Sequence, residues 1–358
     1  MYYSTSVGLD THARSIKAAA LIHETAEVVE GSFAYDPPAL ITWIKLLPQP
    51  ARCVYESGPM GFDLLRKLEA AGIHCSVGAV TKMLRPSGDK IKNDKRDAVF
   101  LARMLAVGNI VRVYIPSEDD EAARDLARAR EDVRQELTRA KHLLSKFLLR
   151  KGILYDEGKR AWTKTHRRWL EHLELPLPTE RLVLSEYLIS IEEAERRKER
   201  LDKAIDNMAQ TDRWHSVVSR LCLLRGISTT TAFTVTTEIG DFSRFKNASA
   251  FYSFLGLVPS LNESGGSTSR GPITKTGNSH VRKLLIESAW HHRRRYLPSA
   301  QVFPEDTPVS VAQVAKKANL RLHDRASHLM SRRVHPCKAN TAVAREVAGF
   351  VWSLANMS

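Results

Sequence analysis

Four acidic residues near the start of the sequence have the spacing of a carboxylate cluster that binds metal ions. Asp10 and Glu56 each stand at the end of a predicted β-strand, where open α/β sheets usually place their functional sites. Asp94 and Asp97 are three residues apart at the start of a predicted helix, so both carboxylates share one helix face. Four converging carboxylates would repel one another unless cations lay among them, and oxygen-only ligands favour Mg²⁺, with Mn²⁺ as the alternative. Such ions polarise phosphate oxygens, so the cluster predicts displacement chemistry at a phosphodiester.

Each of these acids also has an ordinary structural explanation. Asp94 and Asp97 could be a helix N-cap and its first-turn partner, while Asp10 and Glu56 could be turn acids. The metal site is therefore predicted from the four acids together and not from any one of them.

A second candidate centre is a segment rich in serine and glycine, residues 262–271, which is predicted to be a polar loop. In its basic surroundings the alkoxide of Ser264 could be stabilised and a phosphate held in place. The cations that would bind phosphate are Arg270, Lys275, Arg282 and Lys283. The alternative is that the segment is a flexible loop without chemistry.

Residues 224–242 resemble a helix-hairpin-helix, with a glycine turn at Gly226. The backbone N–H groups of such a turn can bind a phosphate. A plain helical turn explains the same pattern.

The charge distribution indicates a polyanionic partner. The 54 basic and 40 acidic residues give a net charge of +14. The net charge is +3 in residues 1–117 and zero in residues 118–215. It is +11 in residues 216–358, where 19 residues are basic and 8 are acidic. A field of that sign attracts nucleic acid, although a merely basic protein without such a partner would show the same excess.

The elements that must position these residues fall into three blocks, predicted as domains 1–117, 118–215 and 216–358. In the first block a three-strand meander precedes alternating helices and strands, which predicts a mixed sheet with helices on its faces. The predicted strands are 6–10, 15–22, 27–33, 52–56 and 74–77, and the predicted helices are 37–47 and 61–71.

The middle block is predicted to be helical, with apolar residues at the alternating three and four spacing of heptads. One run includes Leu126, Val133, Leu137, Ala140, Leu144 and Phe147, and the other includes Leu184, Tyr187, Ile191, Ala194, Leu201, Ile205 and Met208. The pattern fits either an intramolecular helical hairpin or a coiled coil that joins subunits.

Composition excludes several classes of protein. A hydrophobic fraction of 43% is enough to build a core, so the chain is not wholly disordered. No apolar run approaches the roughly 18 residues of a membrane span, and the first residues do not have the pattern of a secretory signal. The four cysteines are scattered and suggest neither zinc nor a disulfide framework, which fits a cytoplasmic location and no membrane partner.

Taken together, these segments resemble the DEDD insertion-sequence transposases, the RNA-guided family often called bridge recombinases. The resemblance covers nearly the whole chain and depends on the order of several short motifs. They are residues 8–10, 55–59, 92–98, 242–245, 256–259, 264–266, 273–277 and 344–346.

The resemblance implies an α/β domain with an RNase H-like, RuvC-like fold, a coiled-coil insertion, and a mostly helical C-terminal domain. It implies a catalytic tetrad at Asp10, Glu56, Asp94 and Asp97, and a serine, aligned with Ser264, that forms a covalent phosphoserine link. It further implies a homo-oligomer, a dimer or a tetramer, in which carboxylates of one subunit meet the serine of another. Donor and target DNA would pair with a noncoding guide RNA.

Three functions are thus open at this point. The first is a DNA recombinase that uses serine transesterification and Mg²⁺. The second is a metal-dependent nuclease or junction resolvase that uses water, with Ser264 only a loop residue. The third is a nucleic-acid-binding relative without catalysis. Within the first, Ser267 and Ser269 are alternatives to Ser264 because they lie a few residues away.

Overall fold

The computed structural model describes residues 2–79, 94–156, 160–264 and 267–357. The chain divides into two compact units, Met1–Pro116 and Ser117–Ser358. We call them unit 1 and unit 2 and describe each by itself.

Unit 1 contains a five-stranded mixed sheet, which confirms the sheet predicted from the sequence. Its strands are β1 (Thr5–His12), β2 (Ser15–Ile22), β3 (Val28–Ala34), β4 (Ala51–Glu56) and β5 (His74–Gly78). Their order across the sheet is β3-β2-β1-β4-β5. The β1–β2 and β2–β3 pairs are antiparallel, whereas β1–β4 and β4–β5 are parallel. The first three strands are therefore a meander, and the chain then crosses over through helices.

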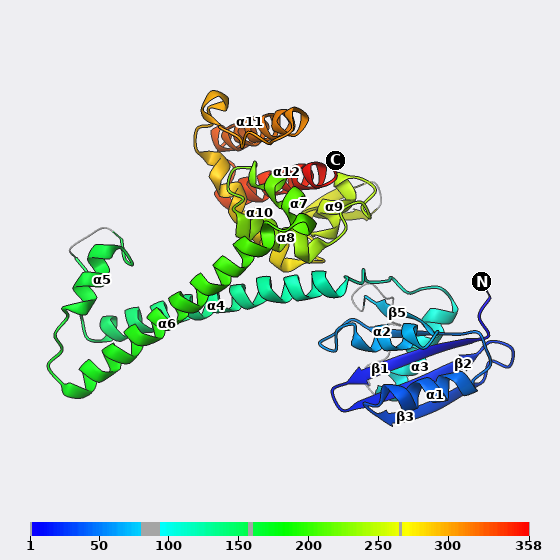
Figure 1. The fold of residues 1–358 in the computed structure, drawn as a ribbon. Coiled ribbons are helices and arrows are strands. Elements are labelled where there is room, and N and C mark those ends of the chain that lie inside the picture. The colour runs from blue at the N-terminus through cyan, green and yellow to red at the C-terminus, as the bar shows by residue number, and fades with distance from the viewer. Residues whose placement is uncertain (1, 80–93, 157–159, 265–266, 358) are drawn as a thin grey trace. The chain divides into compact units, whose positions relative to one another are not determined.

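Helices pack on both faces of this sheet, because the strands are apolar on both sides. One face packs against α1 (Pro37–Leu46) and α2 (Asp63–Ala70) in a core that includes Val7, Leu9 and Tyr55. The other face packs against α3 (Asp94–Ala106) through Val54, Leu101 and Leu105 (Figure 1). Side chains alternate between the two faces along each strand, so the strand sequence decides which residues meet α3.

Two long helices, α4 (Glu118–Arg150) and α6 (Pro178–Ala209), form an intramolecular hairpin in unit 2. They lie side by side, and the short helix α5 (Lys164–Glu171) lies in the connection between them (Figure 1). Heptad residues from both helices share one core, which includes Leu137, Leu144, Leu184 and Ile191. The apolar heptad residues of the two helices are therefore buried against each other within one chain, as the intramolecular hairpin predicts.

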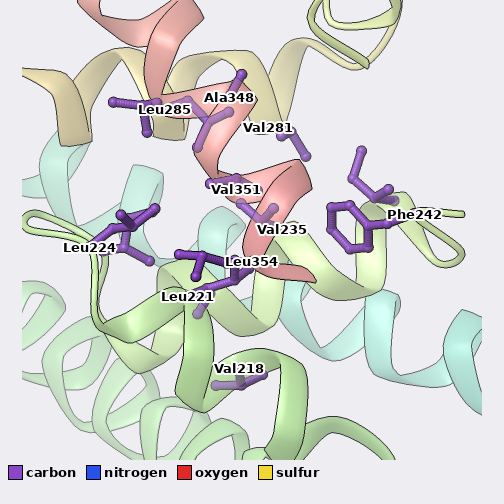
Figure 2. Packing of buried hydrophobic residues seen from close by; sticks show 14 of the residues in the cluster. Val218, Leu221, Leu224, Val235, Phe242, Val281, Leu285, Ala348, Val351 and Leu354 are labelled. Atoms are coloured by element: carbon purple, nitrogen blue, oxygen red, sulfur yellow. The ribbon is translucent and has the colours of Figure 1, made fainter. Parts of the chain in front are cut away.

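The rest of unit 2 is a helical body with one small hairpin. Its helices are α7 (Asp212–Cys222), α8 (Thr229–Ile239), α9 (Ala248–Phe254), α10 (Ser279–Ala289), α11 (Val309–Ser331) and α12 (Pro336–Ala355), with short 3-10 turns at Trp290–Arg293 and Pro298–Ala300. Figure 2 shows Leu221, Val235, Leu285 and Val351 from four of these helices in one buried cluster.

Strands β6 (Pro259–Ser264) and β7 (Ser267–Ile273) pair in antiparallel fashion. The prediction that residues 262–271 form a loop is therefore wrong for the described part of that segment. None of the helices in the described ranges is both long and apolar enough to cross a membrane.

Candidate catalytic and nucleic-acid-binding sites

Asp10 and Glu56 lie on neighbouring parallel strands. Glu56 ends β4 as predicted, but Asp10 does not end β1, because pairing with β2 extends that strand to His12. β1 and β4 are paired as far as Leu9 opposite Tyr55, and Asp10 and Glu56 are the next residue on each strand. Both residues are partly buried, and the Asp10 side chain is 21% exposed. Since paired strands lie about 4.8 Å apart, the structure brings these two predicted acids to the same end of the sheet.

Both acids lie on the sheet face that α3 covers. Val54 packs against α3, and a Cβ atom on Gly8 would lie only 2.1 Å from the carbonyl oxygen of Ala98 in that helix. Asp10 and Glu56 are each two residues beyond these contacts, and residues two apart share a face of a strand. Glycine at position 8 is thus what allows α3 to approach the sheet closely at this point.

The direction of α3 places its first turn over the acids. Nη2 of Arg52, near the start of β4, donates a hydrogen bond of 2.8 Å to the carbonyl oxygen of Leu105, near the end of α3. Together with the glycine contact, this hydrogen bond makes α3 antiparallel to β4. The strand rises about 13 Å from Arg52 to Glu56, and the helix rises about 12 Å from Leu105 back to Asp97. Asp97 is therefore level with Glu56.

Helix α3 carries the other two predicted acids. Asp97 is partly buried, and Asp94 is the first residue of α3, although its side chain lies outside the described residues. Among the side chains that the structure does describe, no three His, Cys, Asp or Glu converge closely enough to hold a metal ion. The donor types nevertheless fit a hard cation, because both strand ends and the first turn of α3 offer carboxylate oxygens.

Two further residues, which were not among the predicted site residues, lie beside Asp10. Nε2 of His12 is 3.2 Å from Oδ2 of Asp10. Lys17 is the cross-strand partner of Asp10 on β2, and its Nζ donates a hydrogen bond of 2.5 Å to Oγ of Ser32 on β3. The signal for His12 was present in the sequence, since alternation along a strand puts residues 10 and 12 on one face.

The predicted nucleophile lies at the end of the β6–β7 ladder. Ser264 pairs with Ser267, and Ser269 pairs two rungs farther down with Asn262. The three serines that the sequence left as alternatives therefore lie within three rungs of one hairpin. Two residues, both glycine, separate the paired serines, and such a spacing in the sequence is a signal for a tight hairpin. The side chains of Ser264 and Ser267 lie outside the described residues.

A groove of about 680 Å³ runs between the base of this hairpin and α12. Its apolar wall includes Pro259, Pro272 and Ile273, and its opposite side carries Lys338 and Arg345. A surface that combines apolar and cationic groups can contact both the bases and the phosphates of a nucleic acid. Pro259, Ile273 and Arg345 belong to motifs of the family resemblance, whereas Pro272 and Lys338 do not.

The predicted phosphate-binding cations divide into two groups. Arg282 donates hydrogen bonds from Nη1 to the carbonyl oxygens of Leu255 (3.0 Å) and Thr276 (2.8 Å), and burial lowers the pKa of its guanidinium. Lys283 forms a 3.0 Å ion pair with Glu131 of α4. Both side chains thus have internal partners that hold the helical body together. Lys275 is exposed, and the side chain of Arg270 lies outside the described residues.

The buried carboxylate of Glu238 links α4, α8 and the start of α10 within unit 2. Glu238 is 2% exposed and accepts hydrogen bonds from Nε of Arg128 (2.8 Å) and Nδ2 of Asn278 (2.8 Å), with Nδ1 of His280 at 3.7 Å. Burial alone would raise the pKa of Glu238, but the polar contacts with His280, Arg128 and Asn278 outweigh burial and lower it to about 2. Glu238 is thus an ionised structural anchor, which the sequence did not reveal because its partners are distant in the chain.

The helix-hairpin-helix-like segment, residues 224–242, contains the turn at Gly226 and α8, whereas α7 ends before it at Cys222. Gly226 has a φ of +81°, and a Cβ atom there would lie 2.6 Å from the carbonyl oxygen of Ser288. Oγ of Ser228 caps α8 by accepting a hydrogen bond of 3.3 Å from the backbone N–H of Thr231. A glycine is therefore required at this turn for both conformation and space. Phosphate binding by the turn stays a prediction.

Two family models match the chain. A model of the DEDD type described as "Transposase" matches residues 7–152, a range that includes all four predicted acids. A model described as "Transposase IS116/IS110/IS902 family" matches residues 218–303, a range that includes the β6–β7 hairpin.

Curated proteins with the same kind of description are similar along most of the chain. "Putative transposase y4qE" of Sinorhizobium fredii is 37% identical over 305 residues, which cover 84% of this chain and 74% of that protein. "Transposase for insertion sequence element IS1533" of Leptospira borgpetersenii is 30% identical over 335 residues, which cover 91% of this chain and 97% of that protein.

Proposed function

Because this chain belongs to the IS116/IS110/IS902 family of insertion-sequence transposases, which cut and rejoin DNA, we propose that it does so by metal-assisted serine transesterification. The observation that carries the metal site is the register of α3 on the sheet, which makes Asp97 level with Glu56. The strand order and the parallel β1–β4 pair support an RNase H-like, RuvC-like assignment for unit 1.

The carboxylates of Asp10, Glu56, Asp94 and Asp97 would hold Mg²⁺, or alternatively Mn²⁺. When bound, such an ion polarises the scissile phosphate and stabilises negative charge on the departing oxygen. The contribution of the chain is to fix the carboxylates at one end of the sheet, since rigid elements hold ligands more precisely than loops do.

Ser264 is the proposed nucleophile. Its Oγ loses a proton and forms a bond to phosphorus, while the bond from phosphorus to a deoxyribose oxygen breaks and that oxygen gains a proton. One phosphoester bond replaces another, so a second deoxyribose hydroxyl can reverse the step and rejoin DNA without ATP. Ser267 and Ser269 are the alternatives if the assigned residue is wrong.

Basic residues near the hairpin would position the phosphates. Arg270 and Lys275 lie on the hairpin and just after it, and the groove beneath adds Lys338 and Arg345. Arg282 and Lys283 were selected for the same role, but their internal partners support a structural contribution. The +11 charge of residues 216–358 supports binding of nucleic acid in general.

The proposed partners are donor and target DNA, a noncoding guide RNA, and further copies of the chain. A homo-oligomer, a dimer or a tetramer, would combine the carboxylates of one subunit with the serine of another. Exposed apolar side chains on and just before α6 support a subunit contact, because such residues are costly to leave in water. They are Leu177, Leu182, Val183 and Ile189.

The test is to incubate the full-length protein and its co-purifying RNA with Mg²⁺ and supercoiled DNA that carries the ends of the element. We expect an SDS-resistant protein–DNA adduct that peptide mapping places at Ser264 and that S264A lacks. S267A and S269A are matched controls, because each removes one hydroxyl from the same hairpin and should retain the adduct.

Each other outcome identifies an alternative function. Strand cleavage without an adduct, unchanged in S264A but lost in D97A, would show a nuclease that uses water. DNA binding without cleavage in any variant would show a nucleic-acid-binding relative that is not an enzyme. An adduct lost only in S267A or only in S269A would support serine transesterification with that serine, and not Ser264, as the nucleophile.

A further inference from the structure

One face of α4 carries a row of basic side chains that none of the assigned sites uses. Arg139, His142, Lys146 and Arg150 are all exposed. Their spacing of three, four and four residues places them along one line of the helix, because residues three and four apart are neighbours on its surface. We call these four residues the α4 stripe.

The charges of α4 are separated along its length. Its first half is rich in acidic residues, whereas residues 137–151 contain Arg, Lys and His but no Asp or Glu. In that second half, Lys141 pairs with Glu195 at 2.9 Å, and Lys151 pairs with Glu180, both on α6. The α4 stripe has no such carboxylate partner among the described residues.

The α4 stripe is rigid, because the opposite side of the same helix segment is packed into the hairpin core. Leu144, Phe147 and Leu148 are each at most 6% exposed, and they alternate with the stripe residues. Like charges one helical turn apart on a helix surface repel each other weakly, by about 0.2–0.5 kcal/mol per pair. An anionic partner would remove this repulsion and would meet a row of cations held on a packed helix.

We propose that the α4 stripe binds the sugar-phosphate backbone of duplex DNA. The stripe spans about 16 Å from Arg139 to Arg150, and one DNA strand presents a phosphate every ~3.4 Å along the axis, so several phosphates lie within its reach. Gln135 and Thr138 line a shallow groove together with Arg139, His142 and Lys146. Amide and hydroxyl groups are further donors to phosphate oxygens.

DNA is the occupant that the observations favour over a second copy of the chain. The apolar side chains that support a subunit contact are on or just before α6, and two exposed leucines, Leu143 and Leu149, lie beside the stripe on α4. The four basic residues of the stripe outnumber these leucines and lie in one row, and such a row of cations fits a row of phosphates. The inference rests on the family's action on DNA and is independent of serine chemistry.

The experiment compares two triple variants of the full-length protein. The stripe variant combines R139Q, K146Q and R150Q. The matched control combines R196Q, R200Q and K203Q, which removes the same charge from exposed residues of α6, where acidic residues are interspersed. The affinity for a fluorescent 30-base-pair duplex of arbitrary sequence is measured at several salt concentrations. Circular dichroism melting checks that both variants are folded.

We expect the stripe variant to lose about two to three units from the slope of log K against log salt, since each phosphate contact contributes roughly 0.9. Its affinity should fall by a similar factor for duplexes of any sequence. The control should keep the wild-type slope. A wild-type slope in the stripe variant would overturn the inference.

Two other results would also overturn it. One is a reduced slope for RNA with an unchanged slope for DNA, and the other is a loss of self-association in sedimentation with an unchanged DNA slope. S264A should retain the full DNA slope, so a failure of the serine mechanism and a failure of the α4 stripe give different results.

Discussion

The carbonyl oxygen of Ala98 in α3 lies 2.1 Å from the point where a Cβ atom on Gly8 of β1 would be. Two elements that are far apart in the sequence thus meet without a side chain between them. This contact lies two residues before Asp10 on β1 and one residue after Asp97 on α3. This close approach of α3 to the sheet is therefore directly beside the proposed metal site.

The first prediction is that G8A moves α3 and disables the site. The added methyl group would collide with helix backbone, which cannot rotate away as a side chain can, and overpacking of this kind costs about 1–3 kcal/mol. We expect a lower melting temperature and loss of the DNA adduct. G349A in α12 is the control, because its Cβ atom would make only an ordinary contact, at 3.9 Å from the Cβ atom of Ala248 in α9. Normal adduct formation by G8A would show that α3 does not set the site.

The second prediction concerns metal removal and Asp97. If the carboxylates hold the metal ion, chelation by EDTA should abolish the adduct, and added Mg²⁺ or Mn²⁺ should restore it. D97N keeps the shape of the side chain but removes its charge, so it should abolish the adduct at any Mg²⁺ concentration while DNA binding is retained. D63N is a control in the same unit, because Asp63 is exposed and forms an ion pair with Lys67 on α2, away from the four predicted acids. Adduct formation in EDTA would contradict the metal mechanism.

The third prediction is that H12N weakens metal binding by Asp10. The imidazole contacts the Asp10 carboxylate at 3.2 Å, and mutation of such a partner of a metal ligand typically lowers metal affinity by about 10–100-fold. We expect H12N to need roughly 10-fold more Mg²⁺ for half-maximal adduct formation. The control is H74N, which changes an exposed histidine at the opposite end of the parallel strands. An unchanged Mg²⁺ requirement would show that the contact between His12 and Asp10 does not affect metal binding.

The fourth prediction is an acid-dependent stability contributed by Glu238. The pKa of this carboxyl is about 2 in the folded chain, below its ordinary value of 4.5, so the folded state favours the ionised form. That stabilisation is complete above about pH 5 and is lost as the pH falls toward 2. E238Q lacks it, so E238Q should be less stable than the wild type at pH 7, by about 1–3 kcal/mol. The difference should shrink between pH 5 and pH 3 in urea unfolding.

E199Q is the control for this pH series. Glu199 is 67% exposed and pairs with Lys203 on the same helix, so its removal should change stability little at any pH. A constant difference between E238Q and wild type across the pH range would show that hydrogen bonding to the neutral side chain, and not ionisation, gives Glu238 its effect.

Local patterns in the sequence were sufficient to predict much of the fold and to propose the four acids of the candidate metal site. The strands that carry Asp10 and Glu56, the helix that begins at Asp94, and the heptads of α4 and α6 follow from periodicities of two and of about 3.6 residues. These patterns are local, because hydrophobic alternation depends on neighbours in the chain.

Only the tertiary structure decided how those elements meet. The direction of α3 depends on Arg52 and Leu105, and the internal role of Lys283 depends on Glu131, a residue of another helix. The exposure of the α4 stripe likewise depends on which side of α4 packs against α6. Such contacts join residues that are distant in the sequence, and no periodicity records them. The sequence by itself therefore determined which residues are available for chemistry, and packing between distant elements decided which of them lie together and which remain exposed.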